Sequence, residues 1–235
     1  MIRKIDNKKM GRGNHGWLDS IFHFSFAEYY NPSNINFGVL RVINDDLIEG
    51  GYGFDPHPHR DMEIISYVID GELTHSDSMG NERTVTRGDV QYMSAGRGVT
   101  HSEYNNGKDI LRLLQIWIFP DKKGYTPSYG DYHFNAEDRK NKWLHLVSSK
   151  QGNAPIKINQ DANIYALELS KDEEITFPLG EGRQAYLVQI EGSSLINKEN
   201  LNPKDALEAI EEDLTLKATE ASHYLIIEME KENLL

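Results

Sequence analysis

Short apolar segments separated by glycine turns fill the middle of the chain, and this pattern limits the fold more than any other feature. The segment 62–69 is followed by Asp70-Gly71, a pair typical of a two-residue hairpin turn. Further segments with strand character lie at 72–76, 82–86, 90–94, 101–104 and 111–119. No long helical period interrupts them. Many short strands with glycine turns predict an all-β sandwich or jelly-roll barrel.

Two short runs, residues 55–63 and 95–103, carry the candidate chemistry. Side chains two residues apart in a strand point to the same face, so His57 and His59 form one pair, and His101 and Glu103 form another. If the two strands lie side by side inside a barrel, three imidazoles and one carboxylate converge on one point. A lone His-x-His motif is common and carries little meaning, but here four potential ligands occur together. The pattern predicts a metal site.

The order of the surrounding residues resembles the two-part signature of the cupins. Its elements are Gly51, the histidine pair, Glu63, Gly71, the turn at 88–90, His101 and Asn105. Residues 57–63, 75–80 and 91–103, with 14–20 near the N-terminus, are similar to the pirin family and most similar to its bacterial branch. The resemblance extends from about residue 11 to about residue 134, and the rest of the chain fits the family in outline.

The resemblance implies a bicupin, meaning two cupin barrels in tandem. It also implies that His57, His59, His101 and Glu103 are the metal ligands. Some bacterial members have quercetin 2,3-dioxygenase activity, so the implied reaction opens the central ring of a quercetin-like flavonol with O2 and releases CO. In this reading Glu103 is also the catalytic base that takes the proton of the substrate's 3-hydroxyl group.

Two other functions stay open at this point. Animal pirins act as nuclear iron-dependent coregulators, so the chain could be a redox-sensing regulatory protein that binds a protein partner without turnover. Alternatively, the metal could be purely structural. Imidazole suits several metals, and iron(II) is our first choice, with nickel, copper, manganese and zinc as alternatives.

Glu63 is a rival carboxylate, because it has the same strand parity as His57 and His59. The pirin pattern assigns the ligand role to Glu103 instead, and we expect Glu63 to hold an imidazole N–H. His15 and His23 match the family's N-terminal run as either functional or packing residues. We expect four further histidines, His75, His133, His145 and His223, to be structural or ordinary. The aromatic residues expected at the barrel mouth or in its core are Phe22, Phe24, Phe26, Phe37 and Trp117.

The expected domains are a metal-binding barrel over 1–135 and a metal-free barrel over 136–235, with a connector at 120–141. A weak repeat supports this division, because 69–71 matches 190–192 and 88–90 resembles 212–214. On those offsets the four ligand positions become Pro178, Gly180, Leu225 and Ile227. Asn202 followed by Pro203 predicts one short helix over 202–210.

The composition excludes several classes. A formal net charge of −12 argues against direct binding to nucleic acid, which needs a basic patch. The absence of cysteine excludes disulfides and thiolate ligands. The sequence has no apolar segment of the length expected for a signal peptide or a membrane helix, so we expect a cytoplasmic protein. Because one chain already contains two barrels, we expect a monomer.

Overall fold

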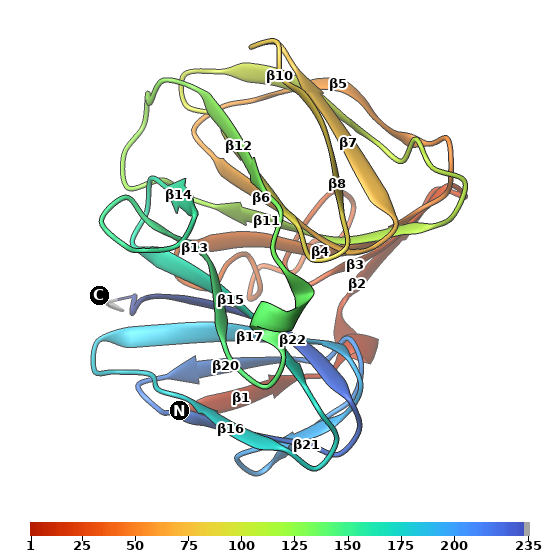
Figure 1. Cartoon of the computed structure of the whole chain (residues 1–235). Coiled ribbons are helices and arrows are strands. Elements are labelled where there is room, and N and C mark those ends of the chain that lie inside the picture. Colours follow the sequence, from red (N-terminus) through yellow and green to blue (C-terminus); the bar gives the residue numbers. More distant parts are fainter. Residues whose placement is uncertain (233–235) are drawn as a thin grey trace. The chain divides into compact units, whose positions relative to one another are not determined.

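The computed structural model describes residues 1–232, and these residues form an almost entirely β structure in two compact units (Figure 1). Its helical turns are two short 3₁₀ helices, η1 (Asn7–Lys9) and η2 (Ala136–Arg139), and residues 1–232 contain no α-helix. Accordingly, we find no helix in this range that could span a membrane. The predicted all-β class is confirmed.

The first unit comprises residues 11–134 and 158–160 and contains two sheets. The larger sheet has the strand order β12-β9-β6-β11-β4-β3-β2, and the smaller has the order β5-β10-β7-β8. The larger sheet is built from β2 (Gly11–Asn14), β3 (Leu18–Phe22), β4 (Leu40–Ile48), β6 (Glu63–Asp70), β9 (Val90–Ser94), β11 (Leu111–Ile118) and β12 (Ser128–Tyr132). The smaller is built from β5 (Gly53–His59), β7 (Glu72–Asp77), β8 (Glu82–Thr86) and β10 (Val99–Tyr104). All six strand segments predicted between 62 and 119 are therefore confirmed.

The second unit comprises residues 1–10, 135–157 and the chain from 161 onward, and it also has two sheets. Their strand orders are β1-β20-β17-β22-β15-β13-β14 and β16-β21-β18-β19. The larger sheet is built from β1 (Ile2–Ile5), β13 (Leu144–Ser149), β14 (Ile156–Ile158), β15 (Ala162–Leu169), β17 (Arg183–Glu191), β20 (Ala206–Ile210) and β22 (Ser222–Glu230). The smaller is built from β16 (Glu174–Phe177), β18 (Ser194–Ile196), β19 (Glu199–Leu201) and β21 (Leu214–Ala218).

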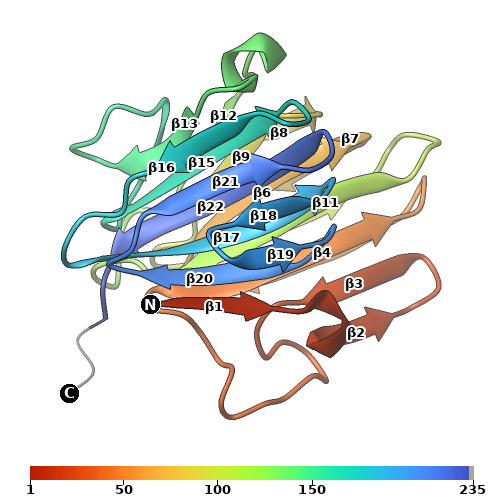
Figure 2. The same cartoon turned by 90° about the horizontal axis from the view of Figure 1, so that it is seen from below.

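The division between the units differs in detail from the expected boundaries. One break lies between Phe134 and Asn135, but the first ten residues belong to the second unit. They do so because β1 pairs with β20, with Ile2 opposite Ala209; Figure 2 shows the red β1 beside the blue β20. The expected connector at 120–141 is also not purely a linker, because β12 lies within it and pairs with β9 of the first unit.

The helix predicted over 202–210 is wrong. Residues 206–210 form β20, which is hydrogen-bonded to β1 on one side and to β17 on the other. Ala206, Leu207 and Ala209 are completely buried in this sheet. Pairing and burial on both sides override the local helix-start signal of Asn202 and Pro203. That signal belongs instead to a turn in which the Asp205 carboxylate accepts the Asn202 N–H at 2.9 Å.

The same turn occurs in the first unit, and it changes the alignment of the internal repeat. In the first unit the Asp89 carboxylate accepts the Thr86 N–H at 2.8 Å just before β9, as Asp205 does just before β20. The strand orders of the two larger sheets agree, since β9 lies next to β6 as β20 lies next to β17. Residues 88–90 therefore correspond to 204–206 and not to 212–214, and β10 corresponds to β21.

With this register the four predicted ligand positions fall on different residues from those expected. Glu103 lies opposite His75 and Leu216 lies opposite Ile196, each partner being four residues after the matched glycine, Gly71 or Gly192, so Glu103 corresponds to Leu216. It follows that the pair His101 and His57 corresponds to the pair Leu214 and Phe177. The counterparts of His57, His59, His101 and Glu103 are Phe177, Leu179, Leu214 and Leu216, in place of Pro178, Gly180, Leu225 and Ile227. All four belong to one buried apolar cluster. The second unit thus fills with hydrophobic side chains the place where the first unit has its histidines.

Candidate metal centre

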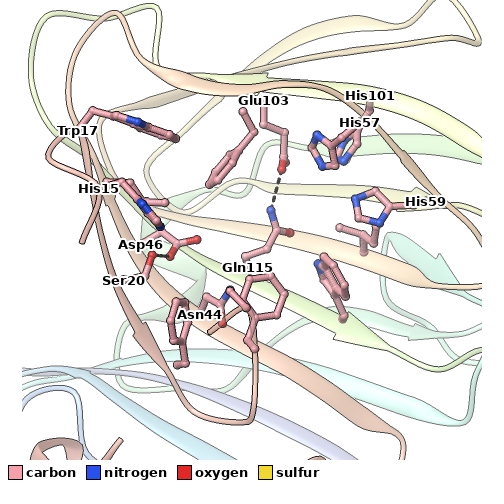
Figure 3. A pocket seen from close by; sticks show the side chains of 17 residues that line it. His15, Trp17, Ser20, Asn44, Asp46, His57, His59, His101, Glu103 and Gln115 are labelled. Atoms are coloured by element: carbon pink, nitrogen blue, oxygen red, sulfur yellow. Dashed lines mark hydrogen bonds between the residues drawn. The ribbon is translucent and has the colours of Figure 1, made fainter. Parts of the chain in front are cut away.

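Strands β5 and β10 bring the histidines together. The two strands are antiparallel neighbours, with His101 directly opposite His57 and Val99 opposite His59. Figure 3 shows the imidazole rings of His57, His59 and His101 side by side. Their centroids lie 4.5–5.0 Å apart. One nitrogen from each ring lies within 4.8 Å of the other two. The predicted meeting of these three side chains is what the structure shows.

Local features of β5 explain this arrangement. Pro56 and Pro58 cannot donate backbone hydrogen bonds, and β5 occupies an edge of the smaller sheet, where proline is tolerated. The register shifts between His101 and Glu103, so that Glu103 lies opposite Phe54. This bulge inserts one extra residue into β5 and lets Phe54 face the same pocket as His57.

Two of the three imidazoles, those of His59 and His101, are held neutral. Burial lowers the pKa of His101 to about 3 and that of His59 to about 4, and the neighbouring histidines lower both pKa values further. A metal binds the neutral ring, so both residues are ready for coordination without losing a proton at neutral pH.

A chain of hydrogen bonds fixes the tautomer of His101. Asp77 accepts from His75 Nε2 at 3.0 Å, so this nitrogen carries the proton and His75 Nδ1 is the acceptor. His75 Nδ1 accepts from Gln91 Nε2 at 3.2 Å and lies 3.4 Å from His101 Nδ1, so His101 Nδ1 carries the hydrogen of this pair. His101 Nε2 is left with its lone pair, and this buried atom has no hydrogen-bond partner among residues 1–232. His75, expected to be structural, thus contacts a candidate ligand directly.

Glu103 is held by three polar side chains. Its Oε1 accepts from Ser66 Oγ and Gln91 Nε2, both at 3.0 Å, and its Oε2 accepts from Gln115 Nε2 at 2.7 Å. The three donors come from adjacent strands β6, β9 and β11, on which Ser66 lies opposite both Gln91 and Gln115. A carboxylate oxygen of Glu103 lies within 4.8 Å of ring nitrogens of His75 and His101.

Glu63 lies elsewhere, and the expectation that it holds an imidazole N–H is wrong. It accepts hydrogen bonds from Tyr92 (2.5 Å), Ser94 (2.6 Å) and the backbone N–H of Asn159 (2.9 Å). The parity argument fails because β5 ends at His59 and Asp61 turns the chain with a φ of 49°. Glu63 therefore starts a new strand in the other sheet.

The histidines and Glu103 open onto a cavity of about 470 Å³, a volume typical of small-molecule sites. Of the expected aromatic residues, Phe22, Phe26 and Trp117 line it, whereas Phe24 is buried elsewhere and Phe37 does not line it. Further lining side chains that sequence reasoning did not place there are Trp17, Leu18, Ser20, Asn44, Asp46, Phe54, Ile64 and Gln115. The cavity is mostly apolar, with a few polar groups on the β3, β4 and β11 strands.

The remaining histidines differ in whether they line the cavity. His15 lines the cavity, whereas His23 is buried and is not among the lining residues. His133 is exposed and pairs with Asp89, and His145 stacks on Tyr165 in the second unit. His223, also in the second unit, is buried and lies 3.5 Å from Glu191. Apart from His15 and His75, these histidines match the expectation of ordinary surface or core residues.

Comparison with known proteins places this geometry in a family. Residues 5–118 match the Pirin family model, and residues 145–229 match a Quercetinase C-terminal cupin domain. A pirin-like protein of Caulobacter vibrioides is 43% identical over 97% of this chain and 99% of its own length. The quercetin 2,3-dioxygenase of Escherichia coli is 40% identical over 97% of each chain.

A solved structure agrees with the fold. The bacterial pirin YhhW from Escherichia coli, in complex with nickel(II), superposes with a TM-score of 0.92. It is 38% identical, and the match covers 99% of this chain and 100% of that one. The two-cupin architecture is therefore confirmed, and the chain belongs to the pirin family.

Proposed function

We propose that this chain is a metal-dependent quercetin 2,3-dioxygenase, which opens the central ring of a flavonol with O2 and releases CO. The observation that carries the proposal is the set of three imidazoles at one end of a largely apolar cavity. The name of the Escherichia coli relative supports the choice of substrate class. The balanced reaction consumes one flavonol and one O2 and yields one CO and one ring-opened ester.

We propose that His57, His59, His101 and Glu103 hold the metal. The donor set fits a divalent cation, because it combines three imidazole nitrogens with one carboxylate. The lone pair of His101 Nε2, buried without a partner, is the strongest sign that the site expects a cation. An iron(II) ion would supply Lewis acidity and redox chemistry toward O2. Nickel, found in the related bacterial pirin, is the first alternative, and copper, manganese and zinc follow.

In this proposal Glu103 is the catalytic base. Its Oε1 already accepts two hydrogen bonds, whereas Oε2 accepts only one, from Gln115. Because a carboxylate oxygen has two lone pairs, one lone pair of Oε2 stays free; it would hold the metal and, when the carboxylate loosens from the ion, take the proton of a flavonol 3-hydroxyl group. The apolar walls formed by Phe22, Phe26 and Trp117 would enclose the aromatic rings and exclude water from the reacting groups.

The test begins with metal-free protein, loaded separately with iron(II), nickel(II), manganese(II), copper(II) and zinc(II). Loss of flavonol absorbance and release of CO should occur together in a one-to-one ratio with a redox-active metal. The Glu103→Gln variant should lose at least about 100-fold in rate, the usual scale for a general base.

Protein that retains its metal but turns over no flavonol with any ion would contradict the dioxygenase proposal. The regulatory alternative would then be tested by capturing cellular partners with iron(II)- and iron(III)-loaded protein.

A further inference from the structure

One side chain that lines the cavity, Asn44, is neither a candidate metal ligand nor one of the three side chains that donate to Glu103. Asn44 lies on β4, opposite Phe22 of β3 and Gln115 of β11. It is only 4% exposed, and its Oδ1 has no hydrogen-bond partner within residues 1–232. It belongs to the same cross-strand row as Gln115, Ser66 and Gln91, but those three donate to Glu103 and Asn44 does not.

A second acceptor lies beside it. Asp46 is two residues further along β4, so its side chain faces the same cavity. Ser20 Oγ donates to Asp46 Oδ1 at 2.5 Å. Burial raises the pKa of this carboxyl group to about 7, which reflects the apolar surroundings. In Figure 3 Asp46 and Asn44 lie on the side of the cavity away from His57, His59 and His101.

A buried acceptor without a donor destabilises the site unless a ligand supplies the missing hydrogen bond. Among the neighbouring lining residues, Ser20 already donates its hydroxyl hydrogen to Asp46, and Leu18, Phe22 and Phe26 carry no polar hydrogen. No group of residues 1–232, the lining His15 included, donates to Asn44 Oδ1, so a donor on the bound molecule would supply the missing hydrogen bond. On an aromatic substrate that donor is a phenolic hydroxyl group.

We infer that Asn44 and Asp46 form a second anchor, which recognises a phenolic hydroxyl group of the substrate at the end remote from the metal. This inference rests on the proposed function, because it assumes a flavonol whose 3-hydroxyl group faces the histidines. The anchor makes the enzyme selective for polyhydroxylated flavonols over the parent compound, since an unhydroxylated ring leaves the Asn44 acceptor unpaired.

The experiment measures binding rather than turnover. Zinc-loaded protein is titrated with 3-hydroxyflavone and with two derivatives, one hydroxylated only on the fused ring and one only on the pendant ring. All three share the metal-binding hydroxyl and carbonyl groups, so their differences report the remote end. We expect one derivative to bind about tenfold more tightly than 3-hydroxyflavone.

The Asn44→Leu variant keeps the size of the side chain and removes the acceptor. We expect it to bind 3-hydroxyflavone at least as tightly as the wild-type protein does and to lose the tenfold preference. The matched control is Phe26→Leu, which changes the wall without changing a hydrogen-bonding group and should shift both affinities by the same factor. The change in binding free energy caused by Asn44→Leu is compared between the hydroxylated derivative and 3-hydroxyflavone. The difference between the two changes is the coupling between Asn44 and the phenolic hydroxyl group.

Three outcomes would overturn the inference: equal affinity of the wild-type protein for all three compounds, an unchanged preference in Asn44→Leu, or no binding of any of them. The test is separable from that of the proposed function. Hydroxyl-dependent binding without turnover by the iron-loaded protein would retain the anchor and reject the dioxygenase. Turnover by the iron-loaded protein without hydroxyl-dependent binding would retain the dioxygenase and reject the anchor.

Discussion

At the scale of single residues, the candidate metal site depends on the side chains that hold its potential ligands: His75 lies against His101, and three polar side chains donate to Glu103. The spacing of His57, His59 and His101 within two short strands is a local signal, readable from sequence. Ser66, Gln91 and Gln115 act on Glu103 only because three strands align them in one row, and that register is not encoded locally. In the sequence, such a side chain is marked by a polar residue inside an apolar strand, as with Gln115 between Leu114 and Ile116.

A variant of His75 tests whether the contact between His75 and His101 supports metal binding. In the His75→Phe variant the ring can still stack on Tyr129, but the acceptor for His101 Nδ1–H is lost. We expect the affinity for nickel(II), measured by competition with a coloured chelator, to fall about 10- to 100-fold. Tyr129→Phe is the matched control, because it keeps the ring that stacks on His75 and removes only the hydroxyl group. Equal affinities of the two variants would exclude a role for His75 in setting the tautomer.

Asp46 predicts a pH dependence of stability. Its pKa is raised by burial from 3.8 to about 7 in the folded state. The folded protein therefore binds a proton more tightly than the unfolded chain, and this contribution to stability is lost as pH rises from about 4 to above 7. In metal-free protein, Asp46→Asn should be more stable relative to wild type at pH 8 than at pH 4.5, by on the order of 3 kcal/mol.

Urea unfolding of both proteins at the two pH values measures this difference. Comparing them at the same pH cancels the opposite contribution of buried His23, whose pKa is lowered to about 4 by burial. A stability difference that is the same at pH 4.5 and pH 8 would contradict a buried, raised-pKa carboxyl group at Asp46.

At the scale of strands, the regular hairpins were predictable because their signals are local. Gly71 illustrates this, since its φ of 79° is the conformation that a glycine turn between β6 and β7 requires. Strands β1, β12 and β20 were missed because each depends on a partner far away in sequence or on burial from both sides. Nothing in residues 202–210 alone reveals that β1 will pair with them.

Gly53 offers a test at this scale. It lies opposite Tyr104, and a Cβ atom there would come within 2.2 Å of the backbone oxygen of Glu103. Gly53→Ala should therefore push β5 away from β10 and separate His57 from His101. We expect at least about tenfold weaker nickel(II) binding, because metal sites require their ligand geometry closely.

Gly180→Ala is the control for this variant. A Cβ atom at Gly180 would meet nothing within 4 Å, and this glycine lies in the second unit. Its metal affinity and melting temperature should match those of the wild-type protein. Unchanged metal binding in Gly53→Ala would show that the close approach of β5 and β10 does not determine the position of the histidines.

At the scale of the whole molecule, the same strand topology occurs twice with different interiors. In the first unit, β5 and β10 carry His57, His59, His101 and Glu103 into the cavity. In the second unit the corresponding positions hold Phe177, Leu179, Leu214 and Leu216 in an apolar core. The loss of ligands was predictable from sequence, but the correct register was not, because the repeats differ in loop length and in the β5 bulge. The chain should accordingly bind one metal ion.

The central claim is that three imidazoles from two strands hold a single ion in an open cavity. Native mass spectrometry of the full chain, after loading with nickel(II) and removal of the excess, counts the bound ions directly. The account predicts one ion per chain in the wild-type protein and none in His57→Ala, His59→Ala or His101→Ala, with each variant still folded. A wild-type protein without a bound ion, or a His101→Ala variant that retains it, would contradict the account.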